Sequence, residues 1–337
     1  GGSELTSDSV IATVKHFPGA GAQTGGVDGT PLTIREDSLE LHLAGFKAAI
    51  AAGVAAVMPY GYSTVPVLGG DAVENSADQS AAVMTDLLRG ELGYTGMIQT
   101  DWGLNFVGAT KAGADILGGM GVRSSAELVD EVDEARLTDA CRRILIAKFR
   151  LGIFENPYVD EDAVYNNVGT EAHKAVAKEA AARSFTLVKY ENASALAGQK
   201  LVVAGSLAQN VRALNSGWTA KEPIEIEGTT ILDALTAKAG TGNVTYIETA
   251  EEVPDDLSGT TAIVVVGEKS GTHDPEWTAA DLKFPQEQVA LVNALKTAGA
   301  NVVSVVIMNR AYVLTPISEA SDSVLLVYRP GVTCGAE

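Results

Sequence analysis

Gly96-Met-Ile-Gln-Thr-Asp-Trp-Gly103 is the stretch of sequence that decides the fold assignment. Its apolar beginning is typical of a short buried strand, and its end places a carboxylate, Asp101, beside an indole, Trp102. In barrels of parallel strands the catalytic side chains lie at the carboxyl ends of the strands. A carboxylate next to an aromatic ring also suits a sugar site, because the ring covers an apolar sugar face. Alone the pattern is weak, since an Asp at a strand end more often caps the next helix, and Trp102 could be core.

A second motif, Val14-Lys-His-Phe-Pro-Gly19, ends a predicted strand at residues 10–17 with two adjacent donors, Lys15 and His16. Such a pair can hold vicinal sugar hydroxyls, although it could equally be a solvated pair at a loop entrance. Taken in this order, the two motifs closely resemble glycoside hydrolase family 3. The resemblance implies that Lys15 and His16 hold the sugar at the non-reducing end, and that Asp101 is the catalytic nucleophile.

A third predicted strand end, Met58-Pro-Tyr-Gly-Tyr62, follows the apolar run at residues 54–60. The resemblance places a tyrosine of this segment against the catalytic carboxylate, and the sequence leaves open whether Tyr60 or Tyr62 is that residue. Met58, Tyr60, Tyr62 and Trp102 are therefore further candidate substrate-binding residues. The sequence leaves two readings for an aromatic side chain at a strand end: it belongs to the core, or it forms a surface on which a sugar stacks.

The loop at residues 268–281 is the expected source of the general acid/base. It follows a clear strand and holds four acids, one His and one Trp in fourteen residues, a high density for a connecting loop. The resemblance implies an acid/base Glu in this loop, but Gly271-Thr-His-Asp-Pro-Glu276 departs from the usual family pattern. If the family pattern is aligned on the preceding strand, His273 falls near the position of the acid/base Glu. The spacing from Pro285 instead favours a residue from Asp274 to Glu276, and Glu268 is a further option for this role. We assign Glu276.

Strands and helices alternate through the first half of the chain, which predicts parallel strands joined by helices. Four strand–helix units can be counted before residue 150, whereas a closed barrel needs eight. By resemblance they are the C-terminal half of a TIM-type (β/α)8 barrel, so we expect a fragment that lacks the first half and any substrate-binding Asp and Arg there. The predicted strands lie at residues 10–17, 54–60, 96–101 and 114–120. The predicted helices lie at 38–52, 75–92 and 105–112, with one or two more helices at 127–150.

The second half predicts an open α/β sheet covered by helices on both faces, an α/β sandwich. The expected domains are a partial barrel at residues 1–158, a polar linker at 159–170, and a sandwich at 171–337 that is truncated at its C-terminus. Thr170 is the predicted N-cap of the first helix after the linker. The predicted strands lie at residues 185–190, 200–206, 243–248, 261–268, 301–308 and 323–328, and the helices at 170–184, 229–239 and 285–298.

The composition excludes several classes of partner. A net charge of −19 opposes binding to nucleic acids and anionic membranes, and suits a neutral substrate. The glycine-rich stretch at residues 19–29 lacks the Gly-Lys-Ser/Thr ending of a phosphate loop, and residues 200–206 lack the three-glycine dinucleotide fingerprint. Cys141 and Cys334 lie far apart with no metal-ligand or redox spacing. We therefore expect no cofactor and no metal.

The N-terminal residues contain neither a signal-peptide pattern nor an initiating Met, so the chain is expected to begin within a domain. The compartment therefore stays open between secreted, periplasmic and cytoplasmic, and the oligomeric state is open as well.

The expected activity is that of a retaining, exo-acting β-glycosidase that acts on a β-glucoside or oligosaccharide. Asp101 would form a covalent glycosyl-enzyme while Glu276 protonates the leaving group, with the sugar between the two domains. Trp218 and Trp277 are expected as additional aromatic walls or as core residues. The alternatives are a β-xylosidase, a β-N-acetylglucosaminidase, a phosphorolytic enzyme that uses a His, or a non-catalytic carbohydrate-binding remnant.

Overall fold

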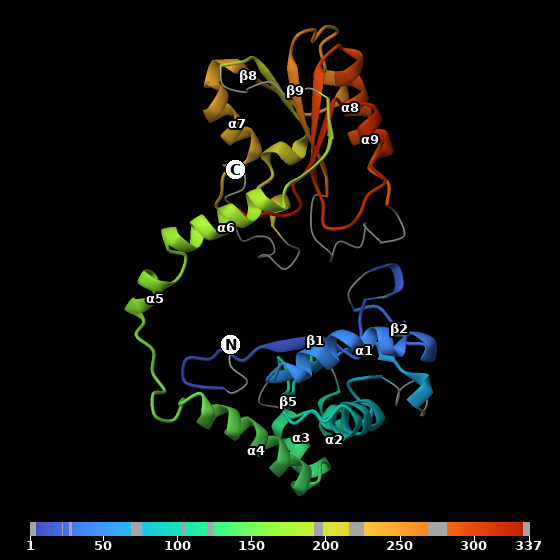
Figure 1. The fold of residues 1–337 in the computed structure, drawn as a ribbon, viewed down its shortest axis with the longest axis vertical. Coiled ribbons are helices and arrows are strands. Elements are labelled where there is room, and N and C mark those ends of the chain that lie inside the picture. Colours follow the sequence, from blue (N-terminus) through green and yellow to red (C-terminus); the bar gives the residue numbers. More distant parts are fainter. Residues whose placement is uncertain are drawn as a thin grey trace. The chain divides into compact units, whose positions relative to one another are not determined.

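The computed structural model divides into two compact units, Gly1–Asp160 and Glu161–Glu337 (Figure 1). Each unit has its own sheet and its own hydrophobic clusters. The structure describes residues 5–21, 23–26, 29–68, 76–102, 105–119, 124–191, 198–215, 226–268 and 282–332.

The first unit is built on a parallel sheet with the strand order β1-β3-β5. The strands are β1 Thr13–Phe17, β3 Ala56–Pro59 and β5 Met97–Ile98. Lys15 lies opposite Met58, and Val57 lies opposite Ile98. Because parallel strands end at the same edge of a sheet, the residues that follow the three strands are brought together there. A second parallel pair joins β2 Leu32–Thr33 to β4 Ser63–Thr64.

The two faces of this sheet pack against different helices, because successive side chains of a strand point to opposite faces. Val57 and Ile98 belong to the cluster that contains Phe46 of α1 and residues of the π-helix. Their neighbours Ala56 and Met97 belong to another cluster with α4. The helices of this unit are α1 Glu36–Ala51, the π-helix Ala82–Glu91, α2 Phe106–Ala112, α3 Ser124–Glu131 and α4 Glu134–Arg150.

Two sequence-based expectations differ from the structure in this unit. The helix predicted at residues 75–92 is a π-helix that begins at Ala82. The strand predicted at residues 114–120 is wrong: within its described part, only the isolated parallel bridge between Gln99 and Ile116 forms. The chain turns immediately afterwards, and Gly119 has a φ of 63°, which ends an extended conformation.

The second unit contains a mixed sheet with the strand order β6-β11-β10-β9-β7-β8. Strand β6 pairs antiparallel with β11, and the other described pairs are parallel. The strands are β6 Thr186–Tyr190, β7 Leu201–Ala204, β8 Val244–Ile247, β9 Thr261–Gly267, β10 Asn301–Ile307 and β11 Ser323–Leu326. An α/β fold is therefore confirmed.

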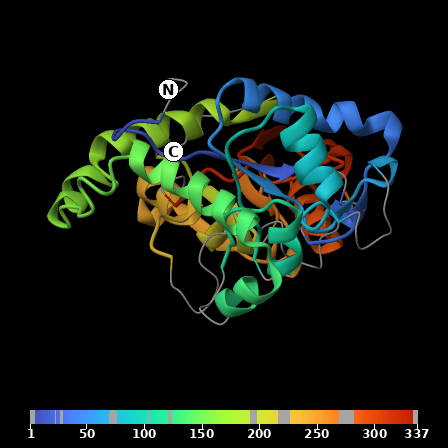
Figure 2. The same ribbon diagram turned by 90° about the horizontal axis from the view of Figure 1, so that it is seen from below.

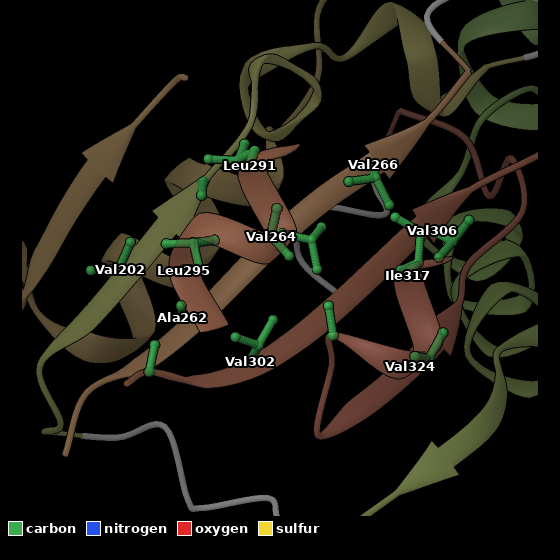
Figure 3. Packing of buried hydrophobic residues seen from close by; sticks show 14 of the residues in the cluster. Val202, Ala262, Val264, Val266, Leu291, Leu295, Val302, Val306, Ile317 and Val324 are labelled. Atoms are coloured by element: carbon green, nitrogen blue, oxygen red, sulfur yellow. The ribbon is translucent and has the colours of Figure 1, made fainter. Parts of the chain in front are cut away.

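Hydrophobic clusters cover both faces of this mixed sheet. Val264 and Val266 of β9 pack with Leu295 of α8 and with α9 (Figure 3). Ile263 and Val265 of the same strand pack on the opposite face, where residues of α7 join the cluster. A strand that is buried on both faces reads as a continuous apolar run, as β9 does. The helices are α7 Ile231–Ala239, α8 Gln286–Thr297 and α9 Thr315–Glu319.

Helices α4, α5 Asp162–Asn167 and α6 Glu171–Ser184 follow one another along the chain as separate segments (Figures 1 and 2). The predicted cap of α6 is confirmed, because the Thr170 side chain accepts a hydrogen bond from the backbone N–H of His173 at 3.3 Å. The predicted polar linker, residues 159–170, contains α5. In the described parts of the chain, no helix is long and apolar enough to cross a membrane.

Candidate functional site

Asp101 lies three residues after the end of β5 and is close in space to His16 of the Lys15-His16 motif. Its Oδ2 lies 3.5 Å from Nε2 of His16. Its Oδ1 accepts a hydrogen bond from the backbone N–H of Trp102 at 2.8 Å. The Asp101 side chain is 34% exposed, so a ligand can reach it. Strand pairing thus brings together the two motifs on which the sequence analysis rests.

His16 and Lys15 differ in their surroundings although they are neighbours. The His16 side chain is 16% exposed, and its ring centroid lies 5.5 Å from that of Tyr60. Lys15 is exposed on the same strand, and its partner in the sheet, Met58, is buried. Met58 therefore supports the strand end from within the core, whereas Lys15 can extend toward a ligand.

The structure separates the roles of the two candidate tyrosines. Tyr60 is 2% exposed, and its hydroxyl donates to the carbonyl of Thr30 at 2.9 Å and accepts from the N–H of Gly29 at 3.1 Å. Tyr62 is 47% exposed, with its ring centroid 5.6 Å from that of Tyr60. Tyr60 therefore packs between His16 and Tyr62, and Tyr62 is the one of these two tyrosines that is exposed.

A cavity of about 470 Å³ opens beside Lys15 and His16. Gln23 and His42 also line it, and sequence analysis did not select them. The ring of His42 packs closely on Gly19: a Cβ at that position would lie 2.3 Å from His42 Nδ1. No motif marks His42, which sits in α1, so only the packing of α1 against the loop after β1 identifies it.

Trp102 is not part of the core of its unit, since 77% of the residue is exposed. An exposed indole next to a reachable carboxylate offers an apolar surface of the kind on which sugar rings stack. No group of three His, Cys, Asp or Glu side chains suited to a metal ion is found among the residues that the structure describes.

The expected acid/base candidates fall mostly outside the described residues. Glu276, Asp274 and His273 lie there, together with the indoles Trp218 and Trp277. Glu268 is described and buried, and its two carboxylate oxygens contact Arg310 Nε at 3.0 Å and Arg329 Nη2 at 2.6 Å. Both carboxylate oxygens are thus engaged by guanidinium groups, and the geometry is that of a buried structural ion pair.

Comparison with protein families matches both halves of the chain. A model described as the glycosyl hydrolase family 3 N terminal domain matches residues 3–122. A model described as the glycosyl hydrolase family 3 C-terminal domain matches residues 186–336. Together the two matches cover most of the chain.

Similar proteins carry the names of glycosidases. Beta-glucosidase C of Emericella nidulans is 34% identical over an alignment of 224 positions that covers 56% of this chain and 35% of that protein. A periplasmic beta-glucosidase/beta-xylosidase of Dickeya chrysanthemi is 31% identical over 57% of this chain and 36% of that protein. A lysosomal beta glucosidase of Dictyostelium discoideum is 28% identical over 97% of this chain and 45% of that protein.

Solved structures share the fold. A β-glucosidase from Listeria innocua has a TM-score of 0.78 at 22% identity, covering 99% of this chain and 50% of that one. An exo-1,3/1,4-beta-glucanase from a Pseudoalteromonas species has a TM-score of 0.78 at 26% identity, covering 97% of this chain and 43% of that one. The chain thus spans between about a third and about half of the length of these relatives. Both family models and these relatives lead to one conclusion: the chain belongs to glycosyl hydrolase family 3.

Proposed function

We propose that the chain is part of a retaining, exo-acting β-glycosidase and that it contains the nucleophile of this enzyme. The proposed substrates are terminal β-D-glucosyl residues. The observation that carries this proposal is the reachable carboxylate of Asp101 at a strand end, 3.5 Å from His16 and next to an exposed indole. Relatives named β-glucosidase support the choice of glucoside as substrate.

In the proposed first step, a carboxylate oxygen of Asp101 attacks the anomeric carbon while the bond from that carbon to the leaving oxygen breaks. A proton from the acid/base passes to the leaving oxygen, and we assign Glu276 to this role. Water then gives its proton to Glu276, attacks the same carbon and releases Asp101. Retention by this route requires the two carboxyl groups to lie about 5 Å apart.

The other site residues are proposed to bind and orient the sugar. Lys15 and His16 donate hydrogen bonds to hydroxyl groups, and the indole of Trp102 covers an apolar sugar face. Tyr62 adds exposed aromatic surface, while Met58 and Tyr60 hold the strand end from the core. Trp218 and Trp277 are proposed as further aromatic walls.

We propose the following division of the chain. Residues 1–158 form the last strands of a (β/α)8 barrel, residues 159–170 a linker, and residues 171–337 an α/β sandwich that contributes the acid/base. The parallel β1-β3-β5 sheet and the mixed sheet of the second unit support this division.

A β-xyloside is the second candidate substrate, since one relative is named beta-glucosidase/beta-xylosidase and another, from Formosa agariphila, beta-xylosidase. Initial rates on aryl β-glucoside, β-xyloside and β-N-acetylglucosaminide, compared as kcat/KM, distinguish these substrates. A chain that binds glucose but turns over none of them is a carbohydrate-binding part, and this result would refute the proposed activity.

The nucleophile is tested by trapping. The chain and its Asp101→Asn variant are incubated with an activated 2-deoxy-2-fluoro-β-glucoside, which forms the glycosyl-enzyme and releases it slowly, and peptides are analysed by mass spectrometry. We expect one fluoroglucosyl group on the peptide that contains Asp101 and none on the variant. A label on another residue would contradict the assignment.

A further inference from the structure

Residues 115–119, which belong to the segment predicted as a strand at residues 114–120, form several hydrogen bonds to the end of β5. The N–H of Ile98 donates to Oδ2 of Asp115 at 2.9 Å, and the carbonyl of Ile98 accepts from the N–H groups of Asp115 and Ile116 at 2.8 and 3.0 Å. The N–H of Thr100 donates to the carbonyl of Ile116 at 2.9 Å. The Thr100 hydroxyl accepts from the N–H of Gly118 at 2.9 Å. These hydrogen bonds hold Ile98 and Thr100, just before Asp101.

Two adjacent glycines, Gly118 and Gly119, lie close to the backbone of Thr100 and Asp101 and to the indole of Trp102. A Cβ at Gly118 would lie 2.4 Å from the backbone oxygen of Thr100. A Cβ at Gly119 would lie 2.0 Å from Cε3 of the Trp102 indole. The indole therefore rests directly on the backbone of Gly119, and only glycine allows this approach, since Gly119 also has a φ of 63°.

Ion pairs hold Asp115, the first residue of the segment. The Asp115 side chain is fully buried, and Arg89 of the π-helix contacts its Oδ2 at 2.6 Å while Arg136 of α4 contacts its Oδ1. Arg89 also donates to the carbonyl of Gly96 at 3.0 Å, just before β5. Charge-assisted bonds of this kind are shorter and stronger than neutral ones. The segment is thus tied to two helices as well as to the strand.

We propose that residues 115–119 form a positioning seat that sets the carboxylate of Asp101 and the indole of Trp102, with Thr100 and Gly119 as positioning residues. The inference rests on the proposed function for the role of Asp101. Oδ1 of Asp101 accepts from the N–H of Trp102, so the backbone that the seat holds also orients the carboxylate. A displacement of about 1 Å at a reacting group can cost about 100-fold in rate.

The hydroxyl of Thr100 is tested with Thr100→Val, which keeps the shape of the fully buried side chain, and with Thr100→Ser, which keeps the hydroxyl. We expect Thr100→Val to lower kcat on an aryl β-glucoside by about 10- to 100-fold with little change in KM. Thr100→Ser should restore kcat to within a few-fold of the wild-type value.

Thr110→Val is the matched control, since Thr110 is buried in the same unit and its hydroxyl donates within α2, to the carbonyl of Phe106 at 2.7 Å. It should lose thermal stability as Thr100→Val does, and keep kcat. Wild-type kcat in Thr100→Val, or an equal loss of kcat in Thr110→Val, would overturn the positioning role.

The seat under Trp102 is tested without relying on turnover. The chain is labelled with 5-fluorotryptophan, and the fluorine signal of residue 102 is assigned by its loss in Trp102→Phe. We expect Gly119→Ala to shift this signal, because the added methyl group displaces the indole. Gly93→Ala is the matched control, since Gly93 has a φ of 66° and a Cβ placed there would meet no described atom within 4 Å, so both variants carry the same backbone strain.

The two readouts separate the seat from the proposed function. If the wild-type chain hydrolyses no glycoside while the signal of Trp102 moves only in Gly119→Ala, the seat stands and the proposed function fails. An unchanged Trp102 signal in Gly119→Ala, or an equal change in Gly93→Ala, would overturn the seat.

Discussion

At the scale of single residues, two carboxylates of the chain, Asp101 and Glu268, have different surroundings. Asp101 is reachable and close to His16, whereas Glu268 is enclosed by Arg310 and Arg329. The two carboxylates therefore differ in accessibility: that of Asp101 is open to a ligand, and that of Glu268 is buried in an ion pair.

His16 is expected to contribute to sugar binding through its donor nitrogen. We expect His16→Ala to lower kcat/KM by about 10- to 100-fold, since a buried polar group that loses its hydrogen-bond partner costs about 1 to 3 kcal/mol. Steady-state kinetics on an aryl β-glucoside measure the change. His173→Ala, on the exposed surface of α6, is the control and should match the wild type. An equal effect in both variants would argue against a binding role.

Asp78 is expected to make the stability of the first unit depend on pH. Burial raises the pKa of its carboxyl above the usual value of 3.8, and its Oδ2 has no hydrogen-bond partner among the described residues. A raised pKa in the folded state means that the stabilising contribution is complete below pH 3.8 and is lost as the pH rises through the folded-state pKa. Asp78→Asn should remove this dependence, which Tm measured from about pH 4 to about pH 8 reports. A wild-type pH dependence that persists in the variant would contradict the prediction.

At the scale of secondary structure, the second unit is stabilised by helices that pack on a strand buried on both faces. Leu295 of α8 is fully buried in the cluster that also contains Val264 and Val302 (Figure 3). Its neighbour toward solvent, Lys296, donates to Asp322 at 2.7 Å instead. The amphipathic spacing of α8 therefore determines which of its side chains are buried against the sheet and stabilise the unit by packing.

Leu295→Ala is expected to destabilise the second unit by about 2 to 5 kcal/mol, because it removes buried methyl groups and leaves a cavity. Urea unfolding followed by circular dichroism gives the change. Leu187→Ala on β6, where the side chain is 55% exposed, serves as the comparison and should cost much less. Similar losses in the two variants would mean that α8 does not pack as described.

At the scale of the molecule, each unit gathers polar side chains at the ends of its parallel strands. In the second unit, the residues involved follow β9, β10 and β11: Glu268, Arg310 and Arg329. Arg329 also donates to the carbonyls of Ala213 and Asn215 at 2.9 Å, which ties the strand ends to the turn after β7.

Glu268→Gln is expected to destabilise the second unit by about 3 to 5 kcal/mol, because the two guanidinium groups lose their buried counter-charge. Thermal unfolding measures the loss. Glu287→Gln, at the exposed start of α8, should change the stability by at most about 0.5 kcal/mol. If Glu268→Gln is fully stable but inactive, and azide restores its turnover of an activated substrate, Glu268 is the acid/base and our structural reading is wrong.

Local patterns in the sequence predicted much of the fold. The apolar runs at β9 and β10 are long and β-branched, so their strands could be identified without the structure. The segment at residues 114–120 was misassigned for a reason that is equally physical. Its apolar beginning resembles a strand, but the buried Asp115 bonds to two arginines and to β5, and Gly118 and Gly119 turn the chain. The Asp within an apolar run and the Gly-Gly pair after it are the signals in the sequence against a strand.

The sequence by itself determined the α/β class and the two motifs that end in His16 and Asp101, because strand periodicity and adjacent polar residues are local properties of a chain. Only the tertiary structure decided that these residues lie 3.5 Å apart, that Tyr60 is enclosed while Tyr62 is exposed, and that Gly119 supports Trp102. Such relations depend on strand pairing and side-chain packing between residues that are distant along the chain, and no local pattern encodes them.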